Sequence, residues 1–304
     1  MFDDRLTEQR NPRSARIDTL SSAQIVDLIN AEDRGVAEAV AEVRAAMAST
    51  IDLVVDAFSK GGRLIYVGAG TSGRLGVLDA AEMPPTFGTD PTMVQGIIAG
   101  GVEALVHSQE GAEDNPDDGA EAIGGRHVGP SDFVLGIATS GTTPYVHGAL
   151  ARARELGART GFLLCTHPTP ELVDSHDVVI APLVGPEVVT GSTRMKAGTA
   201  TKLVLNIITT GAMIRIGKVF GNLMVDLQAT CEKLQDRGER IVMTTLDVER
   251  SEASELLEAA SGHVKTALVM GGRGVGKDEA IGMLHAADGV LAHVLEDRAG
   301  GSTE

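Results

Sequence analysis

Cysteine and long apolar runs are the scarcest features of this 304-residue sequence. Cys165 and Cys231 are its two cysteines, too few for the disulfide framework of a small secreted domain, so we expect a reducing compartment. No apolar run reaches the roughly 18 residues that cross a bilayer, and the first residues lack the pattern of a signal peptide. We therefore expect a cytoplasmic protein without a membrane span.

Positive charge is also scarce. Lys and Arg number 26 against 42 Asp and Glu, a formal net charge of -16, which argues against nucleic acid and anionic membranes as partners. A phosphorylated small molecule is still compatible with this charge, because local backbone N–H groups can bind an anion. The histidines show neither an HExxH motif nor a paired Cys/His spacing, so we expect no metal site and no cofactor.

The chain is organised around the stretch Arg63–Gly88. A short apolar run over 64–67 is typical of a strand buried on both faces, and a glycine turn over 68–73 follows it. A helix is predicted from residue 74 to 82, stopped by Pro84 and the proline after it. Free N–H groups and the positive end of the helix dipole meet at such a turn. The stretch therefore predicts an anion-binding loop.

The glycine spacing over 68–73 matches the dinucleotide fingerprint GxGxxG, which is the first alternative. That fingerprint expects an acidic residue near the end of the next strand. The next apolar segment, 93–98, ends in Ala-Gly-Gly without an acid. Thr71 and Ser72 also place hydroxyls between the glycines, and hydroxyls suit the terminal oxygens of a phosphomonoester. We therefore interpret the loop as a sugar-phosphate site.

Short apolar segments separated by helix-compatible sequence predict the fold class, an α/β protein with a doubly wound five-stranded parallel sheet. The expected strands are 63–68, 93–98, 132–138, 160–165 and 177–181. The expected organisation is an N-terminal arm over 1–20, a sheet domain with flanking helices over 21–240, and a small helical C-terminal domain over 241–304. In that last part a weak repeat, 252–262 and 279–289, predicts two helix pairs joined by a glycine loop over 271–274.

Three loops should meet where the strands end, because ligands of parallel sheets bind beyond the carboxyl ends of the strands. The first is 68–73. The second, 139–144, precedes a predicted helix that Pro144 would start. The third, 185–199, leads into an apolar helix over 200–216. An ordinary Ser/Thr helix cap would explain one such loop, but two hydroxyl-rich loops at one sheet edge favour phosphate.

Five segments of the chain, in order, resemble the bacterial N-acetylmuramic acid 6-phosphate etherases. They are TEQRNP from Thr7, GAGTSGRLGVLDAAEMPPTFG from Gly68, EGAEDN from Glu110, SGTTPYV from Ser140 and GSTRMKAGTATKLVLN from Gly191. These etherases form a branch of the sugar isomerase (SIS) phosphosugar-binding domains that also includes the glucokinase regulator. The resemblance implies an SIS-type sheet, a homodimer, and a lyase of amino-sugar catabolism and cell-wall recycling. It also implies the reaction: D-lactate is eliminated from N-acetylmuramic acid 6-phosphate and water is added, which gives N-acetylglucosamine 6-phosphate.

The resemblance places the two catalytic glutamates on Glu82 and Glu113, with the first as proton donor in the family. We expect the loops to hold the phosphate and the sugar through Gly70, Thr71, Ser72, Gly73, Ser140, Gly141, Thr142, Thr143, Glu187 and Ser192. The chemistry needs one group to remove the proton on carbon 2 and one to protonate the departing oxygen. Glu82, beside prolines and apolar residues, is expected to stay protonated as the acid, and Glu113 to ionise as the base.

Other interpretations of these residues remain open from sequence. Glu82 could be a surface acid at a helix end, and Glu113 could belong to a solvated acidic helix start. A non-catalytic sugar-phosphate regulator would need the loops without the two glutamates, and a sugar-phosphate isomerase would use Glu187. His107 and His147 lie on predicted helical faces, and we interpret both as structural or surface residues rather than catalytic ones.

Overall fold

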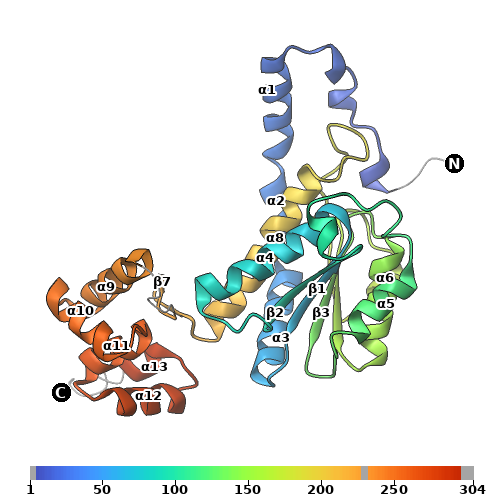
Figure 1. Ribbon diagram of the computed structural model, residues 1–304. Helices are drawn as coiled ribbons and strands as arrows, with labels where there is room; N and C mark the ends of the chain where they lie inside the picture. The colour runs from blue at the N-terminus through green and yellow to red at the C-terminus, as the bar shows by residue number, and fades with distance from the viewer. Residues whose placement is uncertain (1–4, 227–231, 296–304) are drawn as a thin grey trace, which may run out of the picture. The chain divides into compact units, whose positions relative to one another are not determined.

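The computed structural model describes residues 5–226 and 232–295 (Figure 1), so Cys231 lies outside the described residues. The chain divides into two compact units. The first comprises Met1–Ala81 and Pro91–Thr209, and the second comprises Glu82–Asp90 and Thr210–Glu304. The domain boundaries expected from the sequence, at residues 20 and 240, stay a prediction.

A five-stranded sheet forms the centre of the first unit, and every adjacent pair of strands is parallel. The spatial order is β2-β1-β3-β4-β5, which confirms the predicted doubly wound α/β fold. The strands are β1 (Leu64–Gly68), β2 (Val94–Ile98), β3 (Phe133–Ile137), β4 (Arg159–Leu163) and β5 (Val178–Ile180).

Helices cover both faces of this sheet, which is why its central strands are apolar throughout. All residues of β1 and β3 are buried. Ile65 and Val67 point toward α5 (Pro116–Gly124) and α6 (Pro144–Glu155), with which they share a core. Tyr66, on the opposite face of β1, packs against Gly76 of α4 (Gly70–Phe87). Figure 1 shows α5 and α6 together on one side of the sheet.

α5 and α6 pack unusually closely because each contributes a glycine at the contact. A Cβ atom at Gly119 would lie 2.0 Å from the backbone oxygen of Tyr145, and one at Gly148 would lie 1.9 Å from that of Pro116. Real Cβ atoms do not approach backbone oxygens so closely, so no side chain fits at either position.

The remaining helical segments of the first unit, of which α8 continues into the second, lie before β1, between β2 and β3 and after β4. They are η1 (Leu6–Glu8), η2 (Pro12–Ser14), η3 (Ile17–Thr19), α1 (Ser22–Asp33), α2 (Val36–Glu42), α3 (Arg44–Ser59), η4 (Val102–Leu105), α7 (Pro170–Ser175) and α8 (Lys196–Arg215). Ser21 begins α1 through a reciprocal capping box with Gln24. α8 is long and apolar enough to cross a membrane by length and composition alone, but 56% of its apolar window is buried inside the protein, as in a core helix.

The buried carboxylate of Asp79 joins three elements of this unit. It accepts hydrogen bonds from the Tyr66 hydroxyl of β1 (2.9 Å) and from the Asn206 amide (2.6 Å) and Thr209 hydroxyl (3.2 Å) of α8. Burial raises the pKa of Asp79 despite these donors. The network fixes α4 against α8, the two helices that follow the first and third loops.

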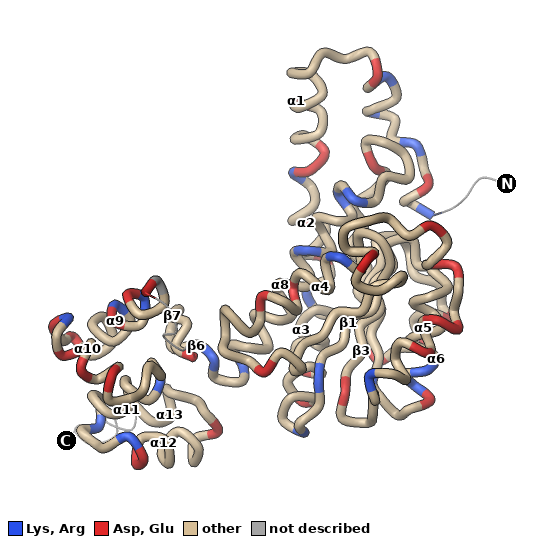
Figure 2. Tube along the Cα trace, viewed as in Figure 1, with Lys and Arg blue, Asp and Glu red and all other residues tan. Residues whose placement is uncertain are grey.

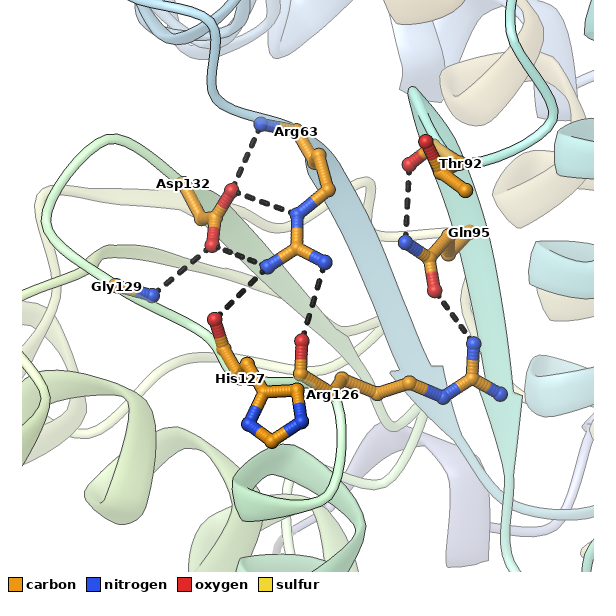
Figure 3. A network of polar contacts seen from close by, with 7 residues as sticks. All are labelled: Arg63, Thr92, Gln95, Arg126, His127, Gly129 and Asp132. Atoms are coloured by element: carbon orange, nitrogen blue, oxygen red, sulfur yellow. Dashed lines mark hydrogen bonds and ion pairs between the residues drawn. The ribbon is translucent and has the colours of Figure 1, made fainter.

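A second polar network holds the amino ends of the strands, at the sheet edge opposite the three loops (Figure 3). Asp132, just before β3, accepts hydrogen bonds from Arg63 Nε (3.0 Å), Nη2 (2.8 Å) and backbone N (2.8 Å), and from Gly129 N (2.9 Å). Arg63 also donates to the backbone oxygens of Arg126 and His127 at 3.1 Å. The ion pair therefore links β1 to the α5–β3 connection.

The second unit contains a helical bundle with its own buried core. Its elements are the β6–β7 hairpin (Val219–Phe220 and Leu223–Met224), α9 (Glu232–Leu246), α10 (Arg250–Ala259), α11 (Val264–Arg273), α12 (Lys277–Ala286) and α13 (Leu291–Leu295). The predicted glycine loop over 271–274 is wrong, because α11 continues to Arg273. Gly271 is helical and lies against Leu246, where a Cβ would come within 2.4 Å of a methyl carbon. Gly274 alone, with a φ of 67°, ends the helix.

Candidate functional site

A cavity of about 570 Å³ opens at the carboxyl edge of the sheet in the first unit. Parts of the three predicted loops line it, together with the N-terminal segment and the chain after η4. The lining residues are Arg5, Glu8, Ala69, Gly70, Thr71, Ser72, Glu113, Asp114, Ile137, Ala138, Thr139, Ser140, Thr142, Thr143, Pro144, Gly191 and Thr193.

The first loop is shorter than predicted, because α4 begins at Gly70 rather than at residue 74. Thr71 and Ser72 therefore occupy the first helical turn, where backbone N–H groups have no intrahelical acceptor. The close approach at Gly68 and Gly73 explains the tight turn, since a Cβ at Gly73 would lie 2.7 Å from the Gly68 oxygen. Hydroxyls and N–H groups thus face the cavity at the positive end of an 18-residue helix.

The expected stop of this helix at its prolines is also wrong. α4 runs through Pro84 and Pro85 to Phe87, and Gly88 N donates to the Pro84 oxygen at 2.9 Å. A proline in a helix removes one hydrogen bond but keeps a helical φ, and Gly88, with a φ of 60°, ends the helix instead.

The second loop precedes α6. Ser140 Oγ and Thr142 Oγ1 are 3.1 Å apart, and Gly141 has a φ of 77°. Thr143 is the N-cap residue, yet its side chain makes no capping hydrogen bond. The ordinary-cap explanation therefore does not account for this hydroxyl, and both Ser140 and Thr143 line the cavity.

The third loop contributes less to the cavity than expected. Gly191 and Thr193 line it, whereas Ser192 and Glu187 do not. Glu187 is 1% exposed and accepts hydrogen bonds from the backbone N–H groups of Lys196 (3.1 Å) and Ala197 (2.9 Å). Burial raises the pKa of Glu187 despite these two donors. This glutamate thus caps α8 from inside the protein.

The two predicted catalytic glutamates lie in different places. Glu113 lines the cavity next to Asp114, and its backbone oxygen accepts a hydrogen bond from Tyr145 N at 3.0 Å. Glu82 is exposed and is not among the described residues that line the cavity. Glu82 belongs to the second unit, whereas the cavity lies in the first.

The two histidines are exposed, and neither lines the cavity. His147 Nε2 lies 2.8 Å from the Gly141 oxygen, and its ring lies 5.3 Å from that of Phe162. His107 follows η4 in a bend rather than on a helix, so its expected helical face is wrong; it is exposed and lies 3.6 Å from Glu103.

The sequence reasoning missed Arg5, Glu8 and Asp114 as cavity residues. Glu8 stands in the TEQRNP segment and Asp114 in EGAEDN, so the resemblance contained a signal for both. Arg5 precedes these segments, and no pattern in the sequence marks it. Among the described residues no group of His, Cys, Asp and Glu has the arrangement of a metal site.

Comparison with known proteins identifies the relatives of this chain. Residues 46–154 match the model of the glucokinase regulatory protein N-terminal SIS domain. The N-acetylmuramic acid 6-phosphate etherase of Salinibacter ruber is 55% identical over 96% of this chain and 94% of its own length. That of Gloeobacter violaceus is 53% identical over 97% of this chain and 96% of its own.

Similarity to solved structures is weaker. The phosphoheptose isomerase GmhA from Neisseria gonorrhoeae superposes with a TM-score of 0.49 at 16% identity, covering 63% of this chain and 98% of that one. By contrast, the two etherases are 53–55% identical to this chain over nearly its full length, and this similarity decides the assignment: the chain belongs to the N-acetylmuramic acid 6-phosphate etherase family.

Proposed function

We propose that this protein is a carbon–oxygen lyase that cleaves the D-lactyl ether of N-acetylmuramic acid 6-phosphate. The observation that carries the proposal is the cavity itself, where hydroxyls at two helix N-termini share one space with Glu113. The etherase relatives, at 53–55% identity, support the same activity. The products are N-acetylglucosamine 6-phosphate and D-lactate.

The phosphate site of this proposal consists of Thr71, Ser72, Ser140 and Thr143. These hydroxyls lie at the N-termini of α4 and α6, where the positive ends of the helix dipoles favour an anion. In an acidic protein such a site needs no surplus of cations. The other predicted phosphate- or sugar-binding residues of these two loops are Gly70 and Thr142, which line the cavity, and Gly73 and Gly141, which do not.

The reaction requires a base at carbon 2 and an acid at the ether oxygen on carbon 3. With the sugar open as an aldehyde, a base removes the proton on carbon 2, and the bond between carbon 3 and the ether oxygen breaks as an acid protonates that oxygen. Water then adds to carbon 3 of the unsaturated aldehyde. We assign the base to Glu113, inside the cavity, and the acid to Glu82.

The described lining of the cavity does not include Glu82, so the proposal includes a homodimer in which Glu82 of the second copy completes the site. α4 places Glu82 and Leu78 one turn apart on one face, and Leu78 is 52% exposed. An exposed apolar residue beside an exposed carboxyl is what an interface would cover. We further propose the cytoplasm as the compartment, on the scarcity of cysteine.

Incubation with N-acetylmuramic acid 6-phosphate and an assay for released D-lactate test the activity. We expect stoichiometric lactate and N-acetylglucosamine 6-phosphate. Binding of the sugar phosphate without lactate release would instead indicate a regulator, and formation of an isomerised sugar phosphate would indicate an isomerase.

A further inference from the structure

A smaller cavity of about 150 Å³ adjoins the cavity described above. The two cavities share three lining residues, Ala69, Gly70 and Glu113. The rest of the smaller cavity is lined by Arg74 of α4, by the chain just after β2, by η4 and by the segment that leads to α5. The proposed base Glu113 therefore lies at the boundary between the two cavities.

Arg74 is held by two carbonyl groups of η4. Its Nε donates to the Leu105 oxygen at 3.1 Å, and its Nη2 donates to the Ala104 oxygen at 2.6 Å. These two bonds use the side of the guanidinium that carries the Nε–H group. A guanidinium has five N–H donors in a planar fork. Among the described residues, no acceptor contacts the other side, formed by Nη1 and the second hydrogen of Nη2.

The lining suits a small group that has one anionic and one apolar part. Arg74 is half-buried and is the one Lys or Arg among the described residues that line the smaller cavity. Ala104 and Ala112 add apolar side chains to the same lining. A carboxylate could therefore bind Arg74 while a methyl group beside it packs against the alanines.

The surrounding charges make the position of Arg74 significant. Acidic residues are spread over the described parts of both units (Figure 2), so a carboxylate needs a cation close to it in order to bind. Glu110 and Glu113 also line the smaller cavity, but both are exposed. Solvent and salt therefore weaken their repulsion of an entering anion, whereas half-buried Arg74 is less screened.

We propose that the smaller cavity receives the lactyl group of the substrate and that Arg74 binds its carboxylate. The proposal rests on the function proposed above, under which Glu113 removes the proton on carbon 2. The lactyl ether is attached to the neighbouring carbon 3, so a base at the boundary of the two cavities brings the ether next to the smaller one. A cavity of about 150 Å³ holds a molecule of the size of benzene, and the lactyl group is smaller. Its planar carboxylate matches the free side of the guanidinium fork.

This arrangement separates the two anionic groups of the substrate. The phosphate binds the hydroxyls of α4 and α6 in the larger cavity, and the carboxylate binds beyond Glu113 in the smaller one. A sugar phosphate without the lactyl ether leaves Arg74 without its anion. Arg74 therefore contributes to the choice of substrate rather than to binding of the phosphate.

Three sugar phosphates isolate the carboxylate from the rest of the substrate. N-acetylmuramic acid 6-phosphate carries it, the lactamide derivative of that compound carries the same group without charge, and N-acetylglucosamine 6-phosphate lacks the whole lactyl group. Calorimetry with the Glu113→Gln protein measures the three affinities without consuming the substrate. The lactamide should bind about 10- to 100-fold more weakly than the acid. Equal affinities would overturn the proposal without any substitution at Arg74.

Two variants of Arg74, made in the Glu113→Gln protein, locate the contact. Arg74→Gln removes the charge and should weaken the acid by about 10- to 100-fold, with unchanged affinities for the lactamide and for N-acetylglucosamine 6-phosphate. Arg74→Lys keeps the charge without the planar fork and should weaken the acid less. Arg44→Gln is the control, because Arg44 is exposed at the start of α3 and lines neither cavity.

Thermal melting checks that these variants are folded. Equal weakening of all three ligands by Arg74→Gln would show that Arg74 only holds η4 in place, and it would overturn the proposal. Unchanged affinity for the acid, as expected for Arg44→Gln, would overturn it as well.

Failure of the proposed function gives a different result. A wild-type protein that binds N-acetylmuramic acid 6-phosphate but releases no lactate would end the etherase proposal. The ratio of the affinities for the acid and the lactamide, with and without Arg74→Gln, would still decide whether Arg74 contacts the carboxylate.

Discussion

Ser72 and Ser140 belong to different helices and yet line one cavity. If both hydroxyls bind the phosphate, replacing them with alanine removes interactions made equally in the ground state and the transition state. Such a change raises KM more than it lowers kcat. We expect KM of the double variant for the 6-phosphate substrate to rise by about 10-fold or more, and its melting temperature to stay unchanged.

Steady-state kinetics of lactate release measure this effect. Ser22→Ala, at an exposed position at the start of α1, is the matched control. A double variant with wild-type affinity for sugar phosphate would show that the phosphate binds elsewhere.

Glu82 and Glu113 should differ in a partial reaction as well as in the full one. Exchange of the carbon 2 proton with heavy water needs the base but not the acid that protonates the leaving oxygen. We therefore expect Glu113→Gln to abolish both exchange and lactate release. Glu82→Gln should still exchange the proton while lactate release falls by orders of magnitude.

Proton NMR of substrate in heavy water distinguishes these outcomes. The reverse pattern would exchange the two roles, and full activity in either variant would remove that glutamate from the mechanism. Asp114→Asn is the control variant, since Asp114 lines the cavity beside Glu113 and has no assigned part in the reaction.

At the scale of elements, the network around Asp132 joins β1 to the connection before β3. Burial raises the pKa of Asp132, but hydrogen bonds from Arg63 and Gly129 outweigh it and hold the pKa below its usual range. The stabilisation is therefore complete above the unfolded value of about 3.9 and is lost as the pH falls through the lower folded value. Asp132→Asn should lower the free energy of unfolding by about 1–3 kcal/mol at neutral pH.

Urea unfolding at fixed protein concentration measures this at neutral pH and at about pH 3. The difference between wild type and Asp132→Asn should shrink at the lower pH, because the Asp132 carboxylate of the unfolded chain is then protonated. The exposed Asp18→Asn should show no difference at either pH. An effect of Asp132→Asn that is equal at both pH values would contradict the electrostatic explanation.

Most elements could be predicted from the sequence, because their signals are local. Short apolar runs marked all five strands, and Pro144 after a hydroxyl-rich turn marked the start of α6, whereas α4 begins four residues before its predicted start. The position of Arg5 in the cavity lining could not be predicted. The N-terminal segment is held there by the hydrogen bond from Leu6 N to the Thr166 hydroxyl, and these two residues are 160 positions apart. The end of α4 was misjudged because a proline disfavours a helix without forbidding it. Gly271 and Gly272 resemble a loop in sequence. They lie in α11, however, where the absence of a side chain lets Leu246 of α9 pack closely.

At the scale of the whole molecule, the proposal that Glu82 comes from a second copy makes a prediction about subunits. In a homodimer with shared sites, a heterodimer of Glu82→Gln and Glu113→Gln chains contains one site with both glutamates intact and one with neither. Such heterodimers should show about half of the wild-type activity. If both glutamates of a site came from one chain, every site would carry one substitution and the heterodimer would be inactive.

Two different affinity tags allow the heterodimer to be purified and its lactate release compared with either homodimeric variant. Sedimentation supplies the companion measurement. A wild-type species of 31.6 kDa at micromolar concentration would contradict the dimer.

The glycine contact between α5 and α6 has a consequence for the chemistry. Glu113 lies just before α5, and its backbone oxygen accepts a hydrogen bond from Tyr145 N at the start of α6. The separation of these two helices therefore governs how far the proposed base lies from the phosphate loop. Gly119 and Gly148 lie outside the cavity lining. Because neither has a side chain, they set the distance between α5 and α6, and with it the distance from the proposed base to carbon 2 of the substrate.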